Sequence, residues 1–427
     1  MTAMTARPQE LQTILEQALA AIGVPDDATV VVASSGGPDS LALALLMPEC
    51  RPTVVLTVDH GLRPESAHEA EGVGALMAAR GIKHHILRWE GEKPAANIQA
   101  VAREARYRLM ADWCRDHGAA YLATAHHQDD QAETLLLRLA RGSGVYGLAA
   151  MPSASVYEPD GVLRIIRPVL DVPKTALVQY LVSQGVGWVE DPSNTNPQYD
   201  RVKVRRMLAD SPLDGLNSAR LADTAKRLRR SRDALEFYER AWLEGAVEEQ
   251  EAGYIALRGP ALLEAPEDIV LRGLATLCRA FSGRGYTPRM EKLERLQATL
   301  LRGEGGQTLY GTVFVPSGDT ILVTREAAAC EARKALINGT LWDNRFEISC
   351  SGDTRGLEIG ALGEEGWRQA VTKWPEVRDT AVPYMARLAM PAIFDAGQLQ
   401  ALPLMGYNDL DTATIHLSRK PLIRAKK

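Results

Sequence analysis

The chain has 427 residues, of which 46% are hydrophobic, and its formal net charge is −5. A chain of this length can bury a sizeable core and is expected to divide into two or three domains. No apolar run reaches the length of a membrane-spanning helix, and the polar start Met1–Arg7 lacks the apolar stretch of a signal peptide. The five cysteines are scattered without a C-x-x-C spacing, which favours reduced thiols in the cytoplasm over a disulfide framework or a cysteine metal site.

Residues 28 to about 190 alternate short apolar segments with helical segments. The predicted strands are Thr29–Ala33, Thr53–Asp59, His84–Trp89, Tyr121–Thr124 and Val162–Arg167. The predicted helices are Leu41–Met47, Glu65–Arg80, Ile98–His117 and Asp130–Leu139, and Pro173 is expected to open another. Strands separated by helices of this length imply an α/β fold with a parallel sheet covered on both faces. Ligands of such sheets bind beyond the carboxyl ends of the strands.

The first predicted strand leads into the run Ser35-Gly36-Gly37-Pro38-Asp39-Ser40. A glycine turn before a helix leaves backbone N–H groups pointing outward, and the helix dipole adds positive potential, so the junction suits a phosphate. Because it lacks Gly-Lys-Ser/Thr, it is not a Walker loop. It resembles the pyrophosphate loop (PP-loop) of ATP pyrophosphatases, which cleave ATP between the α- and β-phosphates. The alternative is a plain helix cap by Asp39 or Ser40, which needs neither both glycines nor both polar residues.

Polar runs also follow the second and fourth predicted strands. Asp59-His60-Gly61 and His126–Asp130 are therefore expected on the same rim of the sheet as the PP-loop. If a helix starts at Asp129 or Asp130, the carboxylates of Asp130 and Glu133 share a face and can hold Mg²⁺ or an ammonium group. The same spacing also fits a capping box, and the two histidines fit ordinary satisfied polar residues. A zinc site is not expected, because the histidines are adjacent and no cysteine is near.

Two motifs have simpler interpretations. Gly142–Gly147 spells G-x-G-x-x-G, but it follows a predicted helix instead of a strand, so a helix end and a flexible loop are expected there. Arg103 and Arg106 lie three residues apart on one predicted helix face. They form either a solvated basic stripe or a pair of anion contacts.

The second half of the chain has a different character. Residues 201–232 carry ten Lys/Arg against three Asp, and this local positive charge in an acidic protein predicts a phosphate-binding surface. Helices are predicted over Ala219–Trp242 and Leu262–Phe281, followed by a hairpin of Thr308–Val315 and Thr320–Thr324. We expect three domains: an α/β domain over 22–206, a helical domain with a hairpin over 207–330, and a smaller α+β domain over 331–427.

Together these motifs resemble the tRNA(Ile)-lysidine synthetase family, whose catalytic domain is a Rossmann-like PP-loop ATP pyrophosphatase domain. The matching segments, within residues 28–206, are Ser35–Ser40, Asp59–Arg63, Ala102–Arg103, Arg106–Tyr107, Thr124–Thr134, Arg141–Gly142 with Gly144 and Gly147–Leu148, and Trp188 with Asp191 and Ser193–Asn194. A weaker resemblance through Leu309–Glu326 and Leu341–Phe346 looks like the family's C-terminal tRNA-binding modules. One departure is Val202, which stands where the family usually has asparagine, between Arg201 and Arg205.

The resemblance implies an ATP- and Mg²⁺-dependent ligase that joins free L-lysine to the wobble cytidine of an isoleucine tRNA with a CAU anticodon. ATP adenylates the cytidine and releases pyrophosphate, and lysine then displaces AMP, which splits one difficult step into two. The implied catalytic residues are Asp39, Asp130, Glu133 and Arg205, with His127 or a carboxylate as the open candidates for the base. The implied ligand contacts are Ser35, Gly36, Gly37, Pro38, Asp39 and Ser40 for pyrophosphate, Asp39 for Mg²⁺, Asp59 and His60 for adenosine, Arg103 and Arg106 for phosphate or cytidine, Asp130 and Glu133 for lysine, and Arg201, Arg205, Arg227, Arg229 and Arg230 for tRNA.

Three other functions compete with this one. A PP-loop tRNA thiolase usually carries cysteine pairs that this chain lacks. An amide-forming ligase of the asparagine or GMP synthetase type shares the loop but leaves the basic segment and the His-His-x-Asp-Asp run unexplained. A non-catalytic tRNA-binding module is the third, and the intact Asp39, Asp130 and Glu133 argue against it. The sequence leaves the oligomeric state open, and a homodimer is compatible with it.

Overall fold

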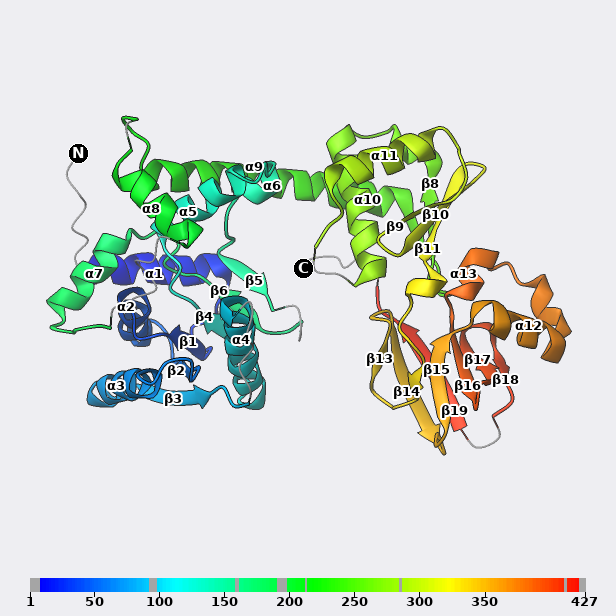
Figure 1. Cartoon of the computed structure of the whole chain (residues 1–427), viewed down its shortest axis with the longest axis horizontal. Helices are drawn as coiled ribbons and strands as arrows, with labels where there is room; N and C mark the ends of the chain where they lie inside the picture. The colour runs from blue at the N-terminus through cyan, green and yellow to red at the C-terminus, as the bar shows by residue number, and fades with distance from the viewer. Residues whose placement is uncertain are drawn as a thin grey trace. The chain divides into compact units, whose positions relative to one another are not determined.

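The computed structural model describes residues 8–91, 98–157, 161–189, 198–211, 213–283, 286–410 and 413–421. The chain forms two compact units, Met1–Asp233 and Ala234–Lys427 (Figure 1). The boundary between them falls within the long helix α9 (Ser218–Ala246). The division into three domains at 206 and 330 stays a prediction. No helix among the described residues is long and apolar enough to cross a membrane.

The first unit is built around a six-stranded sheet in the order β3-β2-β1-β4-β6-β5. Its strands are β1 (Val30–Ser34), β2 (Thr53–Asp59), β3 (Lys83–Arg88), β4 (Tyr121–Ala123), β5 (Ala154–Val156) and β6 (Arg164–Ile166). All neighbours pair in parallel except β5, which runs antiparallel to β6 at the edge. The predicted α/β fold is therefore confirmed. The strand order reverses direction between β1 and β4, and such a switch point opens a crevice for ligands.

Helices cover both faces of this sheet, because successive residues of a strand point to opposite sides. Val30 and Val32 of β1 share one core with helices α1, α2, α3 and α7, whereas Val31 packs with α4 on the other face. The helices of the unit are α1 (Pro8–Ile22), α2 (Pro38–Leu46), α3 (Ser66–Ala79), α4 (Ile98–Asp116), α5 (Gln128–Leu139), α6 (Val145–Leu148), α7 (Lys174–Ser183) and α8 (Asp200–Ala209), with a 3-10 turn η1 (Met47–Glu49).

The G-x-G-x-x-G segment differs partly from its prediction. Helix α5 ends at Leu139 and Gly142 adopts a left-handed φ of +72°, as expected for a helix end. The following residues form the short helix α6 instead of a flexible loop, because Arg138 donates hydrogen bonds to the carbonyl oxygens of Gly147 (2.7 Å) and Ala150 (3.0 Å). The segment is thus anchored to α5.

The second unit begins with a five-stranded sheet in the order β7-β8-β11-β10-β9, packed against helices α10 and α11. Its elements are β7 (Val247–Glu249), β8 (Ile255–Arg258), η3 (Gly259–Leu262), α10 (Glu267–Ser282), α11 (Met290–Leu301), β9 (Gln307–Leu309), β10 (Thr312–Ser317) and β11 (Thr320–Arg325). Two predictions were wrong in detail. The helix expected from Leu262 begins only after Pro266, and the strand expected over Thr308–Val315 is broken by Tyr310 and Gly311, whose φ angles are +60° and +70°.

The remaining residues of the second unit form one five-stranded and one three-stranded sheet with two helices. Their elements are η4 (Ala327–Ala329), β12 (Lys334–Ala335), β13 (Leu341–Trp342), β14 (Phe346–Gly352), β15 (Leu357–Ala361), α12 (Gly363–Lys373), η5 (Pro375–Asp379), α13 (Tyr384–Leu388), β16 (Pro391–Asp395), β17 (Gln398–Leu402), η6 (Pro403–Met405), β18 (Tyr407–Asn408) and β19 (Ala413–Arg419). The predicted combination of helices and strands is confirmed.

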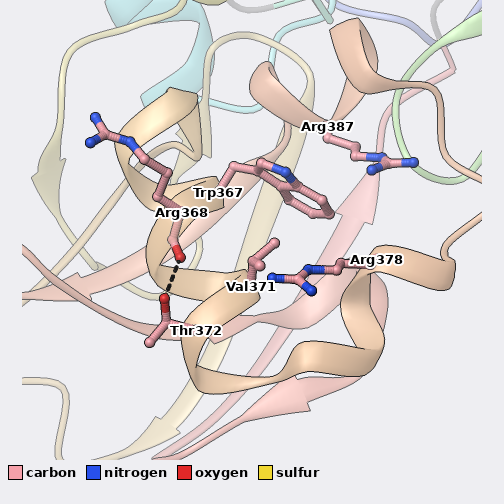
Figure 2. A pocket seen from close by; sticks show the side chains of 6 residues that line it. All are labelled: Trp367, Arg368, Val371, Thr372, Arg378 and Arg387. Carbon is pink, nitrogen blue, oxygen red and sulfur yellow. Dashed lines mark hydrogen bonds between the residues drawn. The ribbon is translucent and has the colours of Figure 1, made fainter.

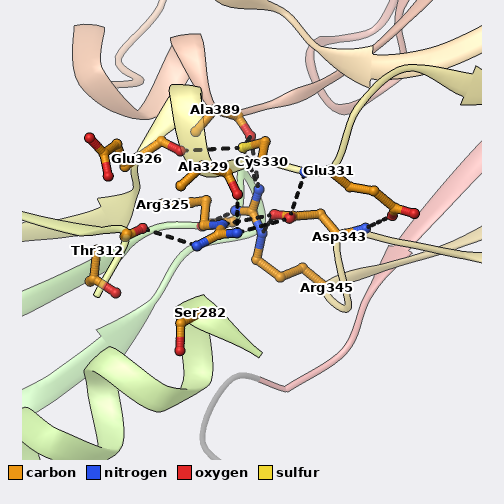
Figure 3. Close-up of polar contacts among 12 residues, drawn as sticks. Ser282, Thr312, Arg325, Glu326, Ala329, Cys330, Glu331, Asp343, Arg345 and Ala389 are labelled. Atoms are coloured by element: carbon orange, nitrogen blue, oxygen red, sulfur yellow. Dashed lines mark hydrogen bonds and ion pairs between the residues drawn. The ribbon is translucent and has the colours of Figure 1, made fainter. Parts of the chain in front are cut away.

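A buried ion network joins these sheets within the second unit (Figure 3). Asp343 Oδ2 lies 2.8 Å from Arg345 Nε and 3.3 Å from Arg325 Nε, which comes from β11. Arg345 is 1% exposed and also donates to the carbonyl oxygen of Ala389 at 3.0 Å. Removing one member of such a buried pair costs about 3–5 kcal/mol, because the remaining charge loses its partner. Asp343 and Arg345, within the segment Leu341–Phe346 noted in the sequence, therefore connect the C-terminal sheets to strand β11.

Candidate active site

The turn between β1 and α2 has the conformation of a phosphate-binding loop. Gly36 adopts φ +80°, and a Cβ at this position would lie 3.3 Å from Val73 Cγ2, so the site requires glycine. The Ser40 hydroxyl accepts a hydrogen bond from the Ser35 N–H (3.0 Å) and donates one to the Gly37 carbonyl oxygen (3.0 Å). Gly37 is the N-cap of α2, and no side chain caps it. The plain-cap alternative for Asp39 and Ser40 is therefore wrong.

Asp39 stands in the first turn of α2 with one oxygen engaged and one free. Its Oδ2 lies 3.5 Å from His127 Nε2 and 3.7 Å from Lys174 Nζ. Its Oδ1 is buried and accepts no hydrogen bond from any described residue. Burial opposes ionisation of Asp39, but His127, Lys174 and Arg205 hold the pKa of its carboxyl below the ordinary value. Asp39 is thus an ionised carboxylate with one oxygen left for a ligand.

This carboxylate suits a metal ion that is completed by a nucleotide. Mg²⁺ is usually bound through one or two carboxylates together with substrate phosphates. The unpaired Oδ1 of Asp39 beside the PP-loop fits that arrangement. In the described part of the chain, no group of three His, Cys, Asp or Glu side chains is placed to hold a metal by itself.

The loop after β4 carries the second predicted constellation. The helix α5 begins at Gln128, slightly before the predicted start, with His127 as its N-cap. The backbone N–H of His127 donates to Asp130 Oδ2 at 3.0 Å. The capping contact is therefore between His127 and Asp130, one turn before the predicted one between Asp130 and Glu133. Asp130 therefore caps the start of α5, and Glu133 takes no part in the capping.

His127 is surrounded by carboxylates. Its Nε2 lies 3.5 Å from oxygens of both Asp39 and Asp130, and its Nδ1 lies 3.6 Å from Asp129 Oδ2. Burial alone would lower the pKa of His127, but these carboxylates raise it above the ordinary value. Asp129 also accepts the backbone N–H of Lys174 at 3.0 Å, which ties the start of α7 to this loop. Lys174 is a site residue that the sequence analysis missed, although Pro173 placed a helix start on this rim.

Glu133 is paired with Arg205 from helix α8. The carboxylate is 1% exposed, and Arg205 binds it in bidentate fashion, Nε to Oε1 at 2.5 Å and Nη2 to Oε2 at 3.3 Å. Burial raises the pKa of Glu133 despite this cation. Val202, the departure from the family pattern, is 6% exposed on the same helix, where an amide would need buried partners.

The predicted adenosine contacts lie on the same rim, at the end of β2. Asp59 Oδ1 accepts hydrogen bonds from the Ser66 hydroxyl (2.6 Å) and the Gly61 N–H (3.0 Å), and the Ser66 hydroxyl holds the pKa of Asp59 below its ordinary value. His60 Nδ1 accepts the Leu62 N–H at 3.1 Å. Both side chains therefore shape the turn into α3. Whether they also contact a nucleotide stays a prediction.

The pKa of His126 shifts in the opposite direction to that of its neighbour His127. Its Nδ1 lies 2.9 Å from the Thr124 hydroxyl. Burial lowers the pKa of His126 to about 4, although Asp130 opposes this shift. The remaining charges that lower it are those of Arg103, Arg167 and Arg201. The pKa values of the two adjacent histidines thus shift in opposite directions. Burial outweighs Asp130 at His126, whereas the surrounding carboxylates outweigh burial at His127.

The predicted basic residues fall into two groups. Several are neutralised by carboxylates, namely Lys203 by Asp200 (3.0 Å), Lys226 by Asp171 (2.7 Å) and Arg232 by Asp233 (2.6 Å). Arg103, Arg201, Arg227 and Arg230 are exposed, and Arg106 and Arg229 are half-buried. The positive surface is therefore smaller than the predicted run of ten cations. Asp191, Ser193 and Asn194 of the family motif lie outside the described residues.

Comparison with known proteins assigns the chain to a family. Residues 8–211 match a family described as a PP-loop domain. The tRNA(Ile)-lysidine synthase of Ruegeria pomeroyi is 38% identical over 382 residues, which cover 88% of this chain and 88% of that protein. The one from Methylobacterium nodulans is 41% identical, over 70% of this chain and 90% of the relative.

The chain belongs to the tRNA(Ile)-lysidine synthase family. The resemblance drawn from the motifs is confirmed, and the loop Ser35–Ser40 lies within the matched PP-loop domain. The similarity to the tRNA(Ile)-lysidine synthase of Ruegeria pomeroyi extends well beyond that domain, because it covers most of both chains.

The opposed pKa shifts predict opposite pH effects on stability. The pKa of His126 falls from 6.5 to about 4 on folding, so its contribution to stability is present above pH 6.5 and is lost as the pH falls toward 4. The pKa of His127 is raised, so its contribution is present below the unfolded pKa and is lost as the pH rises through the folded one. Thermal unfolding from pH 4 to 9 should show His126→Asn losing less stability in acid than the wild type. His127→Asn should be less stable than the wild type by the largest margin at acidic pH. Curves of stability against pH that run parallel to that of the wild type would contradict both assignments.

Proposed function

We propose that the protein is an ATP-dependent ligase that joins free L-lysine to the wobble cytidine of tRNA(Ile) with a CAU anticodon, forming lysidine. The observation that carries the proposal is the meeting of the PP-loop with the carboxylates of Asp130 and Glu133 on one rim of the sheet. Relatives that align over most of the chain are named tRNA(Ile)-lysidine synthase. Such an enzyme acts in the cytoplasm, where its five free cysteines stay reduced.

The first step is adenylation of the cytidine. The ring carbonyl oxygen attacks the α-phosphorus of ATP, the bond to the β-phosphate oxygen breaks, and pyrophosphate leaves. The backbone N–H groups of the loop Ser35–Ser40 stabilise the charge that grows on the leaving group. Mg²⁺, held by Asp39, would neutralise charge on the same phosphates. Lys174, 3.7 Å from Asp39, adds a fixed positive charge beside them.

The second step is attack by lysine. Its ε-amine forms the new carbon–nitrogen bond, and AMP leaves with the ring oxygen. Asp130 and Glu133 hold the ammonium groups of lysine, and a carboxylate has enough lone pairs for Glu133 to keep Arg205 at the same time. The ε-ammonium must first lose a proton. Glu133, with its raised pKa, is the better acceptor, whereas His127 already tends to carry a proton.

The competing functions lose support. The thiolase and the amide-forming ligase share the loop, but the two aligned relatives carry neither name. A binding module without catalysis would not need the buried unpaired Oδ1 of Asp39, because an unsatisfied buried oxygen only costs stability in the absence of a ligand.

The test of the proposal is product analysis with ATP, lysine and tRNA. Lysidine, AMP and pyrophosphate are the expected products, and stoichiometric ADP would overturn the proposal. Asp39→Asn should lower adenylation at least about 100-fold, because it removes the charge that directs the metal in the transition state. The matched control is Asp27→Asn, an exposed acid before β1, which should leave the rate unchanged. A near-normal rate for Asp39→Asn would show that Asp39 has no catalytic task.

The lysine site is tested with the two members of the buried ion pair. Both Glu133→Gln and Arg205→Gln break the pair. Arg205→Gln leaves the buried Glu133 carboxylate without its cation and should lower stability by about 3–5 kcal/mol, whereas Glu133→Gln leaves an Arg205 side chain that is 38% exposed and should cost less. Only Glu133→Gln should raise the KM for lysine, because Arg205→Gln keeps the carboxylate. Steady-state kinetics with varied lysine and thermal unfolding of both variants separate the two effects. An equal rise in KM in both variants would mean that Glu133 acts only through Arg205.

We also propose that the second unit contacts the tRNA. An open pocket of about 550 Å³ in this unit is lined by Trp367, Arg368, Val371, Thr372, Arg378 and Arg387 (Figure 2). The Arg387 guanidinium lies 4.7 Å from the centre of the Trp367 ring and is held by the Val382 carbonyl oxygen at 2.5 Å. An aromatic ring among arginines is the chemistry that proteins use to stack unpaired bases and bind phosphates of RNA.

Point variants test this contact better than truncation. Removing residues 331–427 would also remove Asp343 and leave Arg325 buried without its carboxylate. Trp367→Ala should instead weaken tRNA binding by about 5- to 150-fold, since stacking on one base is worth about 1–3 kcal/mol. ATP affinity should not change. Arg355→Gln, at an exposed arginine paired with Asp353, is the control. Unchanged tRNA affinity in Trp367→Ala would remove the pocket from the interface.

A further inference from the structure

Arg167 occupies the rim of the active-site sheet without a partner for its charge. It directly follows β6, whose neighbour β4 leads into His126 and His127. Its Nη1 donates to the Pro152 carbonyl oxygen (3.0 Å) and lies 3.3 Å from the Ser155 hydroxyl. Its Nε is buried and has no acceptor among the described residues. Neutral groups therefore orient this guanidinium and leave its charge uncompensated.

The charged groups near Arg167 add to its uncompensated positive charge. Burial lowers the pKa of Arg167, and the positive charges of Arg103 and Arg229 lower it further, whereas only the Tyr107 hydroxyl opposes them. No carboxylate of the described chain acts on it. Arg229, on α9, also has a buried Nε without an acceptor. The carboxylates of Asp171 and Asp233 partly offset the charge of Arg229, whereas no carboxylate does so for Arg167. A partly buried guanidinium without a carboxylate costs free energy, and an anionic ligand would offset that cost.

The position of Arg167 separates it from the ATP site. The strand order places β2 on one side of β1 and β4 and β6 on the other. The predicted adenosine contacts Asp59 and His60 lie at the end of β2, so an ATP molecule that uses them would extend from the PP-loop away from β6. Neighbouring strands are about 4.8 Å apart, so β6 lies about 10 Å from β1. An anion beside Arg167 therefore comes from the other substrate.

We propose that Arg167, with Arg103 and Arg229, forms a second phosphate-binding site on this rim, which takes a phosphodiester of the substrate RNA beside the modified nucleotide. The inference rests on the proposed function, which makes RNA the substrate. The three guanidinium groups come from α4, from the end of β6 and from α9. Their planar, fixed donors match phosphate oxygens in a way that a lysine ammonium does not. Arg103 is further oriented by the ring of Tyr107, whose centre lies 5.0 Å from its Cζ.

The experiment uses the full chain with Arg167→Gln. Filter binding of the tRNA over about 50–300 mM salt should show affinity reduced about tenfold and a slope of log K against log salt that is smaller by about 0.7–0.9, the value for one lost phosphate contact. Calorimetry should show unchanged ATP affinity. The melting temperature should stay the same or rise, because an uncompensated charge is removed. Arg167→Lys keeps the charge but lacks the planar guanidinium donors. It should restore most of the salt slope and only part of the tRNA affinity.

Arg164→Gln is the matched control in the same strand. Arg164 donates to the Ile22 carbonyl oxygen at 3.1 Å and lies over the Tyr121 ring, so its loss should lower the melting temperature and leave the salt slope unchanged. If Arg167→Gln also lowers the melting temperature and leaves the salt slope unchanged, Arg167 has only a structural role and the inference is overturned. A loss of ATP affinity with an unchanged tRNA slope would also overturn it. A reduced tRNA slope in a protein that makes no lysidine would support the phosphate site and refute the proposed function.

Discussion

The parallel pairing of β1 with β4 is the constraint on which the site depends. Val30 lies opposite Tyr121 and Val32 opposite Ala123, so the two loops that follow these strands emerge side by side. Asp39 and His127, far apart in the sequence, meet at 3.5 Å for this reason. The register is fixed by burial, because a shift of one residue would turn the inward side chains of a strand to its other face.

The charges around this junction are divided into two regions. On the side of α2 and α5 each carboxylate has a cation, His127 and Lys174 for Asp39 and Arg205 for Glu133. On the side of β6, Arg167 has no carboxylate partner among the described residues, and burial lowers the pKa of His126 to about 4 with the help of the charges of Arg167, Arg103 and Arg201. One region suits an amino acid that carries ammonium groups, and the other suits phosphates. A ligase that brings lysine to a polyanion needs both next to each other.

The strands and the PP-loop could be predicted from the sequence because their signals are local. An apolar run and a glycine turn contain their own information, and β2 matches its predicted bounds. The break at Tyr310 and Gly311 could not be predicted in this way, because residues that favour strands continue through it. The start of α5 was misplaced for a related reason, since histidine is an unusual N-cap and takes this position here through the carboxylate of Asp130.

The pairing of Glu133 with Arg205 has no local signal, because it arises when α8 packs against α5. Arg167, in contrast, has a local signal in the sequence. A polar side chain directly after a predicted parallel strand must fall on the ligand-binding rim, and this rule brought Asp59 and His126 into the candidate site. The predicted strand Val162–Arg167 ended in an arginine, and the rule applied to it equally. The end of each strand in such a sheet is therefore a position where a charged residue should be interpreted as a ligand contact until a partner within the protein is found.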